Sequence, residues 1–213
     1  MEIMKVTILS NSKGGLFTAT MQWAKGLARK GCDVNILFLT QSEEAKRLAP
    51  SEHIRIDYLT FSNHIPNLRA LVNFLIHYHT DIIHINFASF GPLAILKKYV
   101  FKTPFIYTLH GLPQPWLERS LKYKVAYTVE ACLLPIVASR SSAVVAVSNY
   151  VKDMLKRKYG IDSEVIYHGI NAEDFEPKKK ERSKRKLGYN ETDLVILFVG
   201  KLHPYKDPLT LIK

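Results

Sequence analysis

The sequence predicts an α/β fold, a Rossmann-like doubly wound parallel sheet. Strand-like runs of β-branched and aromatic residues alternate with amphipathic helical segments, and the connections between them are short, as in βαβ units. Most of these runs are apolar throughout, which is typical of strands buried on both faces. Seven strands are predicted, at 6–10, 34–40, 54–59, 82–86, 105–109, 143–147 and 164–167.

The helical segments lie between these strands. Apolar residues at helical spacing follow the first strand, and Lys30-Gly31 supplies a C-terminal stop. Ser148 is the expected N-cap of a helix that ends near Tyr159. The remaining helices are predicted at 68–78, 93–100 and 117–140. The strand at 54–59 alternates with polar residues, so we expect it at an edge of the sheet.

A second structural unit is predicted to begin near the end of the chain. Residues 195–199 (Val-Ile-Leu-Phe-Val) have the pattern of a buried strand, Gly200 follows it, and Pro208 stands where a helix would start. This pattern divides the chain into a first, Rossmann-like domain (1–168), a basic connector (169–194) and the truncated start of a second domain (195–213).

Charge and composition restrict the partners. The formal net charge is +11, and charge alone favours anionic partners: nucleic acid, phosphorylated small molecules or an acidic membrane surface. Much of the excess is concentrated in Lys178–Lys186, a solvated segment or a membrane contact. Nucleic acid is not among the expected partners. Two distant cysteines and no visible secretory signal favour a cytoplasmic protein, with peripheral attachment to the inner face of the membrane as an alternative.

The loops after the strands carry the candidate binding residues, because doubly wound sheets bind ligands at the carboxyl ends of their strands. Gly14 and Gly15 follow the first strand and precede a helix, an arrangement that suits an anion. The loop lacks both the Gly-Lys-Ser/Thr triplet of a P-loop and the spacing of a dinucleotide site. A tight turn without a ligand is the alternative interpretation.

Other strand ends supply polar side chains. His110 lies at a strand tip before Gly111, where it could contact a hydroxyl or a phosphate, or be satisfied by backbone groups. His84 lies within its strand, so a structural role is favoured there. Asn86, Ser148 and His168-Gly169 complete the predicted rim. No His/Cys/carboxylate cluster indicates a metal, and no cofactor is expected.

The ordered combination of these motifs resembles glycosyltransferase family 4, a family of retaining enzymes with the GT-B fold. The motifs that carry the resemblance run in the expected order over the whole chain: Gly14-Gly15, Asp81-Ile-Ile-His84, Tyr107-Thr-Leu-His110-Gly111, Ala146-Val-Ser148, Val165 to Asn171, and Phe198-Val-Gly200-Lys201-Leu202 with Lys206.

The resemblance implies a metal-independent transfer of a sugar from a nucleotide-sugar to a glycan, lipid or small-molecule acceptor, with retention. It implies that His110 is catalytic, in contact with the donor sugar, and that Gly14, Gly15, Lys201 and Lys206 bind the donor diphosphate. Asn86, Gly111 and Ser148 would form the acceptor side of the cleft. The family's usual arginine is Lys201 here, which loses the bidentate phosphate fork but keeps the charge.

Two other function classes stay open at this point. A non-catalytic module could bind a phosphate or lipid through the same rim, and a sugar-nucleotide epimerase would share the two-domain architecture. The unfinished strand at 195–199 favours the transferase over the module, and the lack of a carboxylate pair on the rim disfavours the epimerase. The chain alone is expected to be inactive, because the donor domain is missing from it.

Overall fold

The structure is a computed structural model of the 213-residue chain. It describes residues 3–46, 51–59, 61–62, 65–66, 68–86, 88–91, 93, 102–170, 172–175, 180–200, 202 and 206–212. Lys201, Lys178 and Lys179 lie outside the described residues, as does the helix predicted at 93–100 apart from Leu93.

Seven parallel strands form the main sheet and confirm the predicted fold class. They are β1 (Lys5–Ser10), β2 (Asp33–Phe38), β3 (Ile54–Tyr58), β6 (Ile82–Ile85), β7 (Phe105–Leu109), β8 (Ala143–Ala146) and β9 (Glu164–Val165). Their order is β3-β2-β1-β6-β7-β8-β9, which places β3 at an edge as predicted. A short antiparallel ribbon, β4 (Phe61–Ser62) with β5 (Ile65–Pro66), was not predicted.

The strand order contains one reversal of direction. The chain moves from β1 outward to β2 and β3, then returns to β6 on the other side of β1 and continues to β9. The reversal therefore falls between β1 and β6. Open α/β sheets bind their ligands at the carboxyl ends of the two strands that flank such a point.

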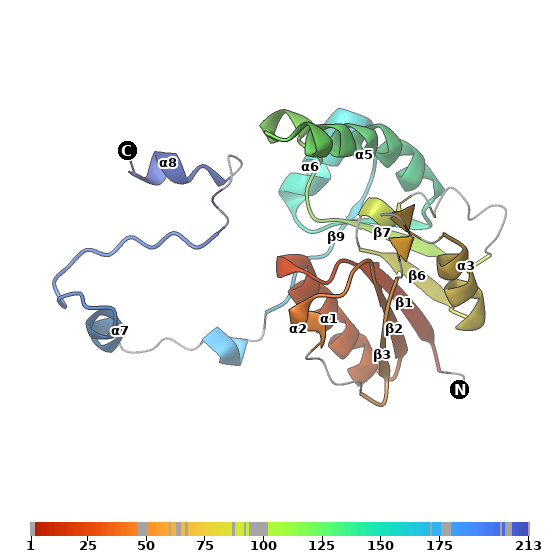
Figure 1. Ribbon diagram of the computed structural model, residues 1–213, viewed down its shortest axis with the longest axis horizontal. Helices are drawn as coiled ribbons and strands as arrows, with labels where there is room; N and C mark the ends of the chain where they lie inside the picture. The colour runs from red at the N-terminus through yellow and green to blue at the C-terminus, as the bar shows by residue number, and fades with distance from the viewer. Residues whose placement is uncertain are drawn as a thin grey trace.

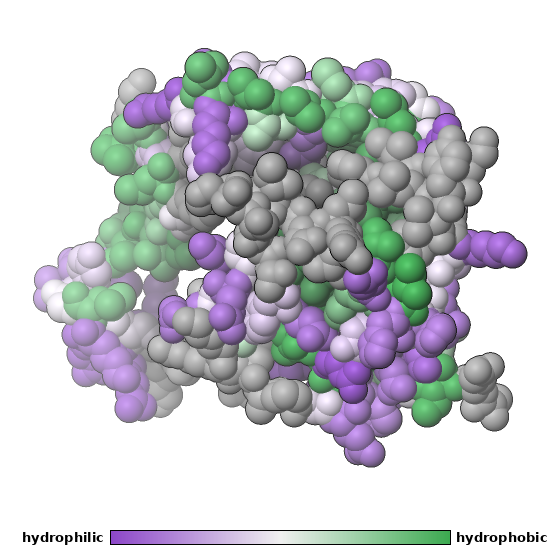
Figure 2. Space-filling view, turned by 45° about the vertical axis from the view of Figure 1, so that its right-hand side comes forward, coloured by the Kyte–Doolittle hydropathy of each residue, from purple (hydrophilic) through white to green (hydrophobic). Residues whose placement is uncertain are grey.

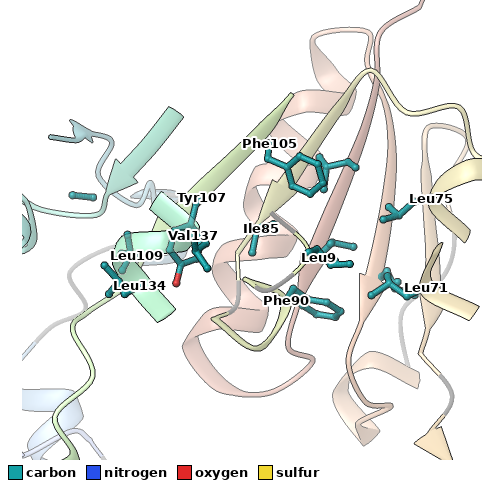
Figure 3. Packing of buried hydrophobic residues seen from close by; sticks show 14 of the residues in the cluster. Leu9, Leu71, Leu75, Ile85, Phe90, Phe105, Tyr107, Leu109, Leu134 and Val137 are labelled. Carbon is teal, nitrogen blue, oxygen red and sulfur yellow. The ribbon is translucent and has the colours of Figure 1, made fainter. Parts of the chain in front are cut away.

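Helices cover both faces of the sheet (Figure 1). On one face α1 (Gly14–Arg29) packs through Met21 and Ala24 against Ile8. On the other face lie α3 (Leu68–His77), α5 (Leu121–Arg140) and α6 (Asn149–Tyr159). Figure 3 shows the core of this second face, where Leu134 and Val137 of α5 lie beside strand residues such as Tyr107 and Leu109.

Helix ends follow the capping residues in the sequence. α1 ends at Arg29, and Gly31 beyond it has a φ of 83°, a left-handed conformation that suits glycine. The Ser148 hydroxyl oxygen accepts a hydrogen bond from the Val151 amide at 3.2 Å, which confirms Ser148 as the N-cap of α6. Gly160, with a φ of 68°, ends the same helix.

The predicted helix at 117–140 is divided. A 3-10 turn, η2 (Pro115–Leu117), is followed by extended backbone at Glu118 and Ser120, and α5 begins at Leu121. Serine prefers the extended N-cap conformation to a helix interior, so Ser120 favours a new helix start at Leu121. The helix itself then runs to Arg140 as expected. The short elements α2 (Glu43–Lys46) and η1 (Ala88–Phe90) complete this part of the chain.

The strand predicted at 195–199 is wrong for this structure. Residues 193–199 form no ladder with any described strand, and Val199 is 85% exposed. A strand needs a neighbour to pair its backbone amides and carbonyls, and none is present among the described residues. The elements around it are η3 (Ala172–Phe175), α7 (Lys180–Lys186) and α8 (Pro208–Ile212). Figure 1 shows α7 and α8 to the left of the sheet and away from it.

Candidate functional site at the strand switch point

The predicted rim residues converge where β1, β6 and β7 end. Asn86 follows β6 directly, and His110 follows β7 directly. Because β6 and β7 pair in parallel with His84 opposite Ile106, the residues two positions further on, Asn86 and Thr108, lie on the same face. This is the face that α1 covers. The geometry therefore brings together residues that are far apart in the sequence.

His110 and Asn86 make a short hydrogen bond. The Nε2 atom of His110 lies 2.5 Å from the Oδ1 atom of Asn86. Asn86 is 0% exposed, and its amide nitrogen donates to the Thr20 hydroxyl at 2.7 Å. Both ends of the Asn86 side chain are thus occupied within the protein. Asn86 thus orients the His110 ring, and its assignment to the acceptor side of the cleft stays a prediction.

A backbone carbonyl sets the direction of these hydrogen bonds. The Thr20 hydroxyl donates to the carbonyl of Leu16 at 2.8 Å, so its oxygen can only accept from its other neighbours. The Ser10 hydroxyl, 2.7 Å away, and the Asn86 amide nitrogen both supply protons to it. The Oδ1 atom of Asn86 then faces His110 and accepts from it.

This direction determines the tautomer of His110. Asn86 Oδ1 is an acceptor, so the proton of the neutral imidazole lies on Nε2 and the lone pair lies on Nδ1. The Nε2 atom of His168 lies 3.1 Å from that Nδ1 atom and donates to it. The two rings stack with centroids 4.9 Å apart. His168 is exposed. A hydroxyl group of an incoming ligand could therefore displace its ring and donate to Nδ1 of His110 in its place.

Trp23 of α1 forms a wall of this cluster. Its ring stacks on His84 at 4.9 Å and on His168 at 5.3 Å, and it contacts His110 at 6.0 Å. His84 is held on its other side by a 2.8 Å hydrogen bond between Nε2 and the Thr108 hydroxyl. The sequence favoured a structural role for His84. Its ring, held between Trp23 and Thr108, forms the floor of the site.

The enclosure lowers the pKa of each of the three histidines. Burial, with a smaller contribution from nearby His110, lowers the pKa of His84 to about 4. Burial lowers the pKa of His110 to about 4 as well, with a smaller contribution from His168. The pKa of His168 is also lowered by burial. At neutral pH the cluster is therefore uncharged, and His110 offers an acceptor nitrogen rather than a cation.

The glycine loop connects to the same network. Gly14 is the first residue of α1 and has a φ of 64°, whereas Gly15 has an ordinary helical conformation. No protein atom lies within 4 Å of a Cβ built at either glycine, so the space beside the loop is open. Leu16, whose carbonyl anchors the hydrogen bonds to His110, is the next residue. The loop and His110 are therefore mechanically linked through Thr20 and Asn86.

Gly111 and Ser148 make no hydrogen bond to this network in the part of the chain that the structure describes. Gly111 is exposed beside His110. Ser148 lies at the end of the neighbouring strand β8, where its hydroxyl oxygen caps α6. Lys206 stands just before α8, in the segment that Figure 1 shows apart from the sheet, and Lys201 lies outside the described residues. The assignment of these residues to the donor and the acceptor stays a prediction.

Sequence reasoning missed Trp23 and Thr20, whereas His168 was among the predicted rim residues, without its contact with His110. Trp23 lies off the apolar stripe of α1, and nothing in its position alone marks it. One signal was available, since residues at spacing two in a strand share a face. His84 with Asn86, and Thr108 with His110, follow this spacing on neighbouring strands and so form one polar surface.

Among the cavities elsewhere in the described part of the chain, two have similar volumes. One of about 500 Å³ is open and lies at the amino ends of β1, β2 and β3, opposite to the site, with Lys5, Asp33 and Arg55 in its lining. The other, of about 490 Å³, is mostly apolar and lies between β7 and α5, with Tyr107 and Glu130 in its lining. Burial raises the pKa of both of these groups.

The fold places the chain in the class of doubly wound α/β domains, which as a rule bind ligands at the strand switch point. Comparison with known families narrows this class. The model of Glycosyltransferase Family 4 matches residues 13–174, which is more than half of the chain. The chain therefore belongs to this family, as the motifs predicted.

The chain is 26% identical over 223 residues to the D-inositol 3-phosphate glycosyltransferase of Stackebrandtia nassauensis and 24% identical over 230 residues to that of Corynebacterium glutamicum.

Solved structures confirm the GT-B type of fold. Sucrose-phosphate synthase from Thermosynechococcus elongatus superposes with a TM-score of 0.69 at 18% identity, over 86% of this chain and 52% of that one. HepE from Anabaena, crystallised with UDP-glucose, superposes with a TM-score of 0.67 at 19% identity, over 87% of this chain and 50% of that one.

The aligned regions also show how much of each relative is matched. The alignments cover 94% and 96% of this chain, but only 50% and 54% of the two D-inositol 3-phosphate glycosyltransferases. The chain thus spans about half the length of the curated relatives it matches. Within the described residues, none of the helices combines the length and apolar character needed to cross a bilayer.

Proposed function

We propose that this chain forms the acceptor-side half of a retaining glycosyltransferase, which transfers a sugar from a nucleotide-sugar to a glycan, lipid or small-molecule acceptor without a metal ion. The observation that carries the proposal is the outward-facing Nδ1 atom of His110 at the strand switch point, with its tautomer fixed by Asn86. Family membership favours this function over a phosphate-binding module or an epimerase.

His110 fits the chemistry of the reacting sugar. In a retaining transfer, positive charge develops at the anomeric carbon while the diphosphate leaves with negative charge. A neutral imidazole adds no positive charge beside that carbon, and its Nδ1 lone pair can accept a hydrogen bond from a sugar hydroxyl. The lowered pKa of His110 keeps the ring in this form at neutral pH.

The glycine loop suits the diphosphate. The first amides of α1 have no partner within the helix and carry the positive end of the helix dipole. Gly14 and Gly15 leave open space in front of these amides, so a diphosphate can approach the backbone closely. Lys201 and Lys206 would neutralise the remaining charge from the opposite side of the cleft, once the second half of the enzyme is in place.

The acceptor is proposed to bind beside Gly111 and Ser148, with Asn86 acting on it only through His110. Catalysis requires the part of the relatives that this chain does not match, so the chain alone is expected to be inactive. UDP-glucose is the first donor to test, because HepE was crystallised with it.

A chimera tests the proposal. This chain, joined to the C-terminal half of the Stackebrandtia nassauensis relative, is assayed for release of UDP from UDP-glucose, with the unfused chain as the control. The chimera should turn over, the unfused chain should not, and His110→Ala in the chimera should reduce turnover by about 100-fold or more. Wild-type turnover in the His110→Ala chimera would contradict the role of His110.

An acidic membrane surface is a further proposed partner, which would make the protein peripheral on the inner face of the membrane. Of the basic segment Lys178–Lys186, the structure describes α7, which is exposed and contains no apolar residue. Charge alone gives an attraction that salt screens strongly. If this segment is the contact, reversing the charge of four of its basic residues should weaken vesicle binding. Unchanged binding would remove the segment from the contact.

A further inference from the structure

The outward face of α5 carries an uncovered apolar stripe. Leu121, Val125, Val129 and Ile136 are 75%, 54%, 51% and 45% exposed, and Cys132 between them is exposed as well. Their spacing of three or four residues puts them on one side of the helix. In the second half of the helix the opposite side packs into the core through Leu134, Val137 and Ala138, whereas in the first half that side is exposed too, with Tyr123 at 55%. Figure 2 shows apolar atoms along the upper edge of the molecule, where α5 lies in Figure 1.

Basic residues border this stripe, and the stripe itself contains no acidic residue, while Glu118 stands beside Arg119 before the helix. At about 100° per residue, Lys122 and Lys124 fall on opposite flanks of the stripe, and exposed Arg119 precedes the helix. Arg140 lies at the other end. The acidic residue of α5, Glu130, lies on the inner side against the apolar cavity, where burial raises its pKa. The outward face therefore combines apolar side chains with positive charge.

The turn before α5 continues this surface. Trp116 of η2 is 63% exposed, and the Lys158 ammonium of α6 lies 4.9 Å from the centre of its ring. Tryptophan and lysine side by side are typical of segments at the boundary between lipid headgroups and acyl chains, because one supplies an amphipathic ring and the other a charge for phosphate.

From these observations we propose that α5 and η2 form the surface through which this protein docks on an anionic lipid bilayer, with the stripe of α5 inserted among the acyl chains. Stable peripheral attachment needs two signals, buried apolar area and electrostatic attraction, and this face supplies both. This face is positively charged. An anionic bilayer attracts it, whereas a second copy of the chain presents the same positive charge and repels it.

The basic helix α7 lacks one of the two signals. Its sequence, Lys-Glu-Arg-Ser-Lys-Arg-Lys, has nothing apolar to insert. Two of its cations also hold the chain beside it, since the Lys184 ammonium donates to the carbonyls of Glu191 and Asp193, and Arg185 pairs with Glu191 at 3.4 Å. The docking proposed for α5 is independent of the glycosyltransferase proposal.

Vesicle co-sedimentation of the chain tests this docking. Vesicles of phosphatidylcholine with phosphatidylglycerol are compared with vesicles of phosphatidylcholine alone. The double variant Val125→Asp with Val129→Asp should lower partitioning onto anionic vesicles by about tenfold or more. The matched control is Ile76→Asp in α3, an apolar residue that is also 54% exposed but lies off the stripe, and it should bind as wild type.

The charge requirement is tested separately. Lys122→Glu with Lys124→Glu should lower partitioning by about tenfold and remove most of its salt dependence. Lys180→Glu with Lys186→Glu in α7 makes the same change in net charge and should have a much smaller effect. Circular dichroism confirms that each variant is folded.

Three results would overturn the proposal. One is partitioning of the Val125→Asp, Val129→Asp variant equal to wild type. Another is no binding of the wild type to anionic vesicles. The third is a wild-type dimer in size-exclusion chromatography that this variant dissociates, which would assign the stripe to a second copy of the chain.

Discussion

The side-chain amide of Asn86 lies between His110 and the first turn of α1, and it orients the imidazole through a 2.5 Å hydrogen bond to Nε2. The amide is itself oriented by Thr20, whose hydroxyl is bonded to the Leu16 carbonyl. Three side-chain and backbone groups thus determine which nitrogen of His110 faces outward. The lone pair on Nδ1 follows from this arrangement.

Replacement of Thr20 tests this arrangement. Thr20→Val keeps the shape of the side chain but removes the acceptor for the Asn86 amide, so the amide can reverse and the Nε2–H tautomer of His110 should lose population. Turnover of the chimera should fall about tenfold, the equivalent of one hydrogen bond of ~1.4 kcal/mol. Imidazole ¹⁵N chemical shifts of the chain labelled with ¹⁵N-histidine report the tautomer.

The matched control for this experiment is Thr20→Ser. Serine retains the hydroxyl and should keep both the wild-type tautomer and most of the turnover. A Thr20→Val spectrum identical to that of the wild type would show that the Leu16 carbonyl does not determine the state of His110.

The two glycines of the loop should respond differently to alanine. Gly14→Ala places a Cβ at a φ of 64° and should cost about 1–2 kcal/mol of unfolding free energy. Gly15→Ala meets no protein atom within 4 Å and replaces a helical glycine, so stability should be unchanged or rise by up to about 1 kcal/mol. Urea unfolding of the chain measures both values.

Binding of a nucleotide-sugar separates the two effects. If the space beside Gly15 holds the donor diphosphate, Gly15→Ala should weaken binding of UDP-glucose to the chimera while leaving the fold intact. Isothermal titration calorimetry measures this affinity. Unchanged affinity in Gly15→Ala would remove the loop from the donor site.

Stability should fall as the pH is lowered from about 6.5 to about 4. Burial lowers the pKa of His84 and His110 to about 4 in the folded chain, whereas in the unfolded chain these histidines titrate near 6.5. Between these values the unfolded state binds more protons, so acid favours unfolding, and the full contribution of these groups is present only above pH 6.5. Urea midpoints at a series of pH values measure this dependence.

His84→Gln should flatten the pH dependence, because glutamine can bond to Thr108 without titrating in this range. His77→Gln removes an exposed histidine outside the cluster and serves as the control. Equal slopes for His84→Gln and the wild type would argue against a neutral, enclosed His84.

Ser148 is both a predicted rim residue and an N-cap, and substitution distinguishes the two roles. Ser148→Ala should lower the unfolding free energy by about 1 kcal/mol through loss of the cap of α6. Ser148→Asp retains a capping oxygen and should restore most of this stability. If Ser148→Asp restores stability but the chimera remains impaired in acceptor turnover, Ser148 has a role on the rim as well.

Much of the fold was predictable because strand and helix periodicity repeat regularly. All seven strands of the sheet, the edge position of β3, and the caps Gly31 and Ser148 follow from local patterns. The break before α5 and the ribbon of β4 with β5 were not predicted, because both depend on short irregular segments. The predicted strand at 195–199 failed for a physical reason, since local propensity cannot form a ladder without a partner.

The site was predictable only in outline. His110, Asn86 and the glycine loop were placed at strand ends by the rule for doubly wound sheets. The hydrogen bond between His110 and Asn86 spans 24 residues, and the stacking of Trp23 on His168 spans far more. Such contacts depend on strand order, which periodicity does not contain. Strand order also determines that His84, predicted to be structural, borders the site.

The anchoring of His110 to a main-chain carbonyl has a consequence for how this protein can change during evolution. Every amino acid at position 16 offers the same carbonyl, so that position can drift freely as long as α1 is preserved. Positions 20 and 86 must instead be compatible with one another, because an isolated change at either leaves the amide without its partner. Across the homologues that share this loop, variation at these two positions should be correlated, while variation at position 16 should be independent of both.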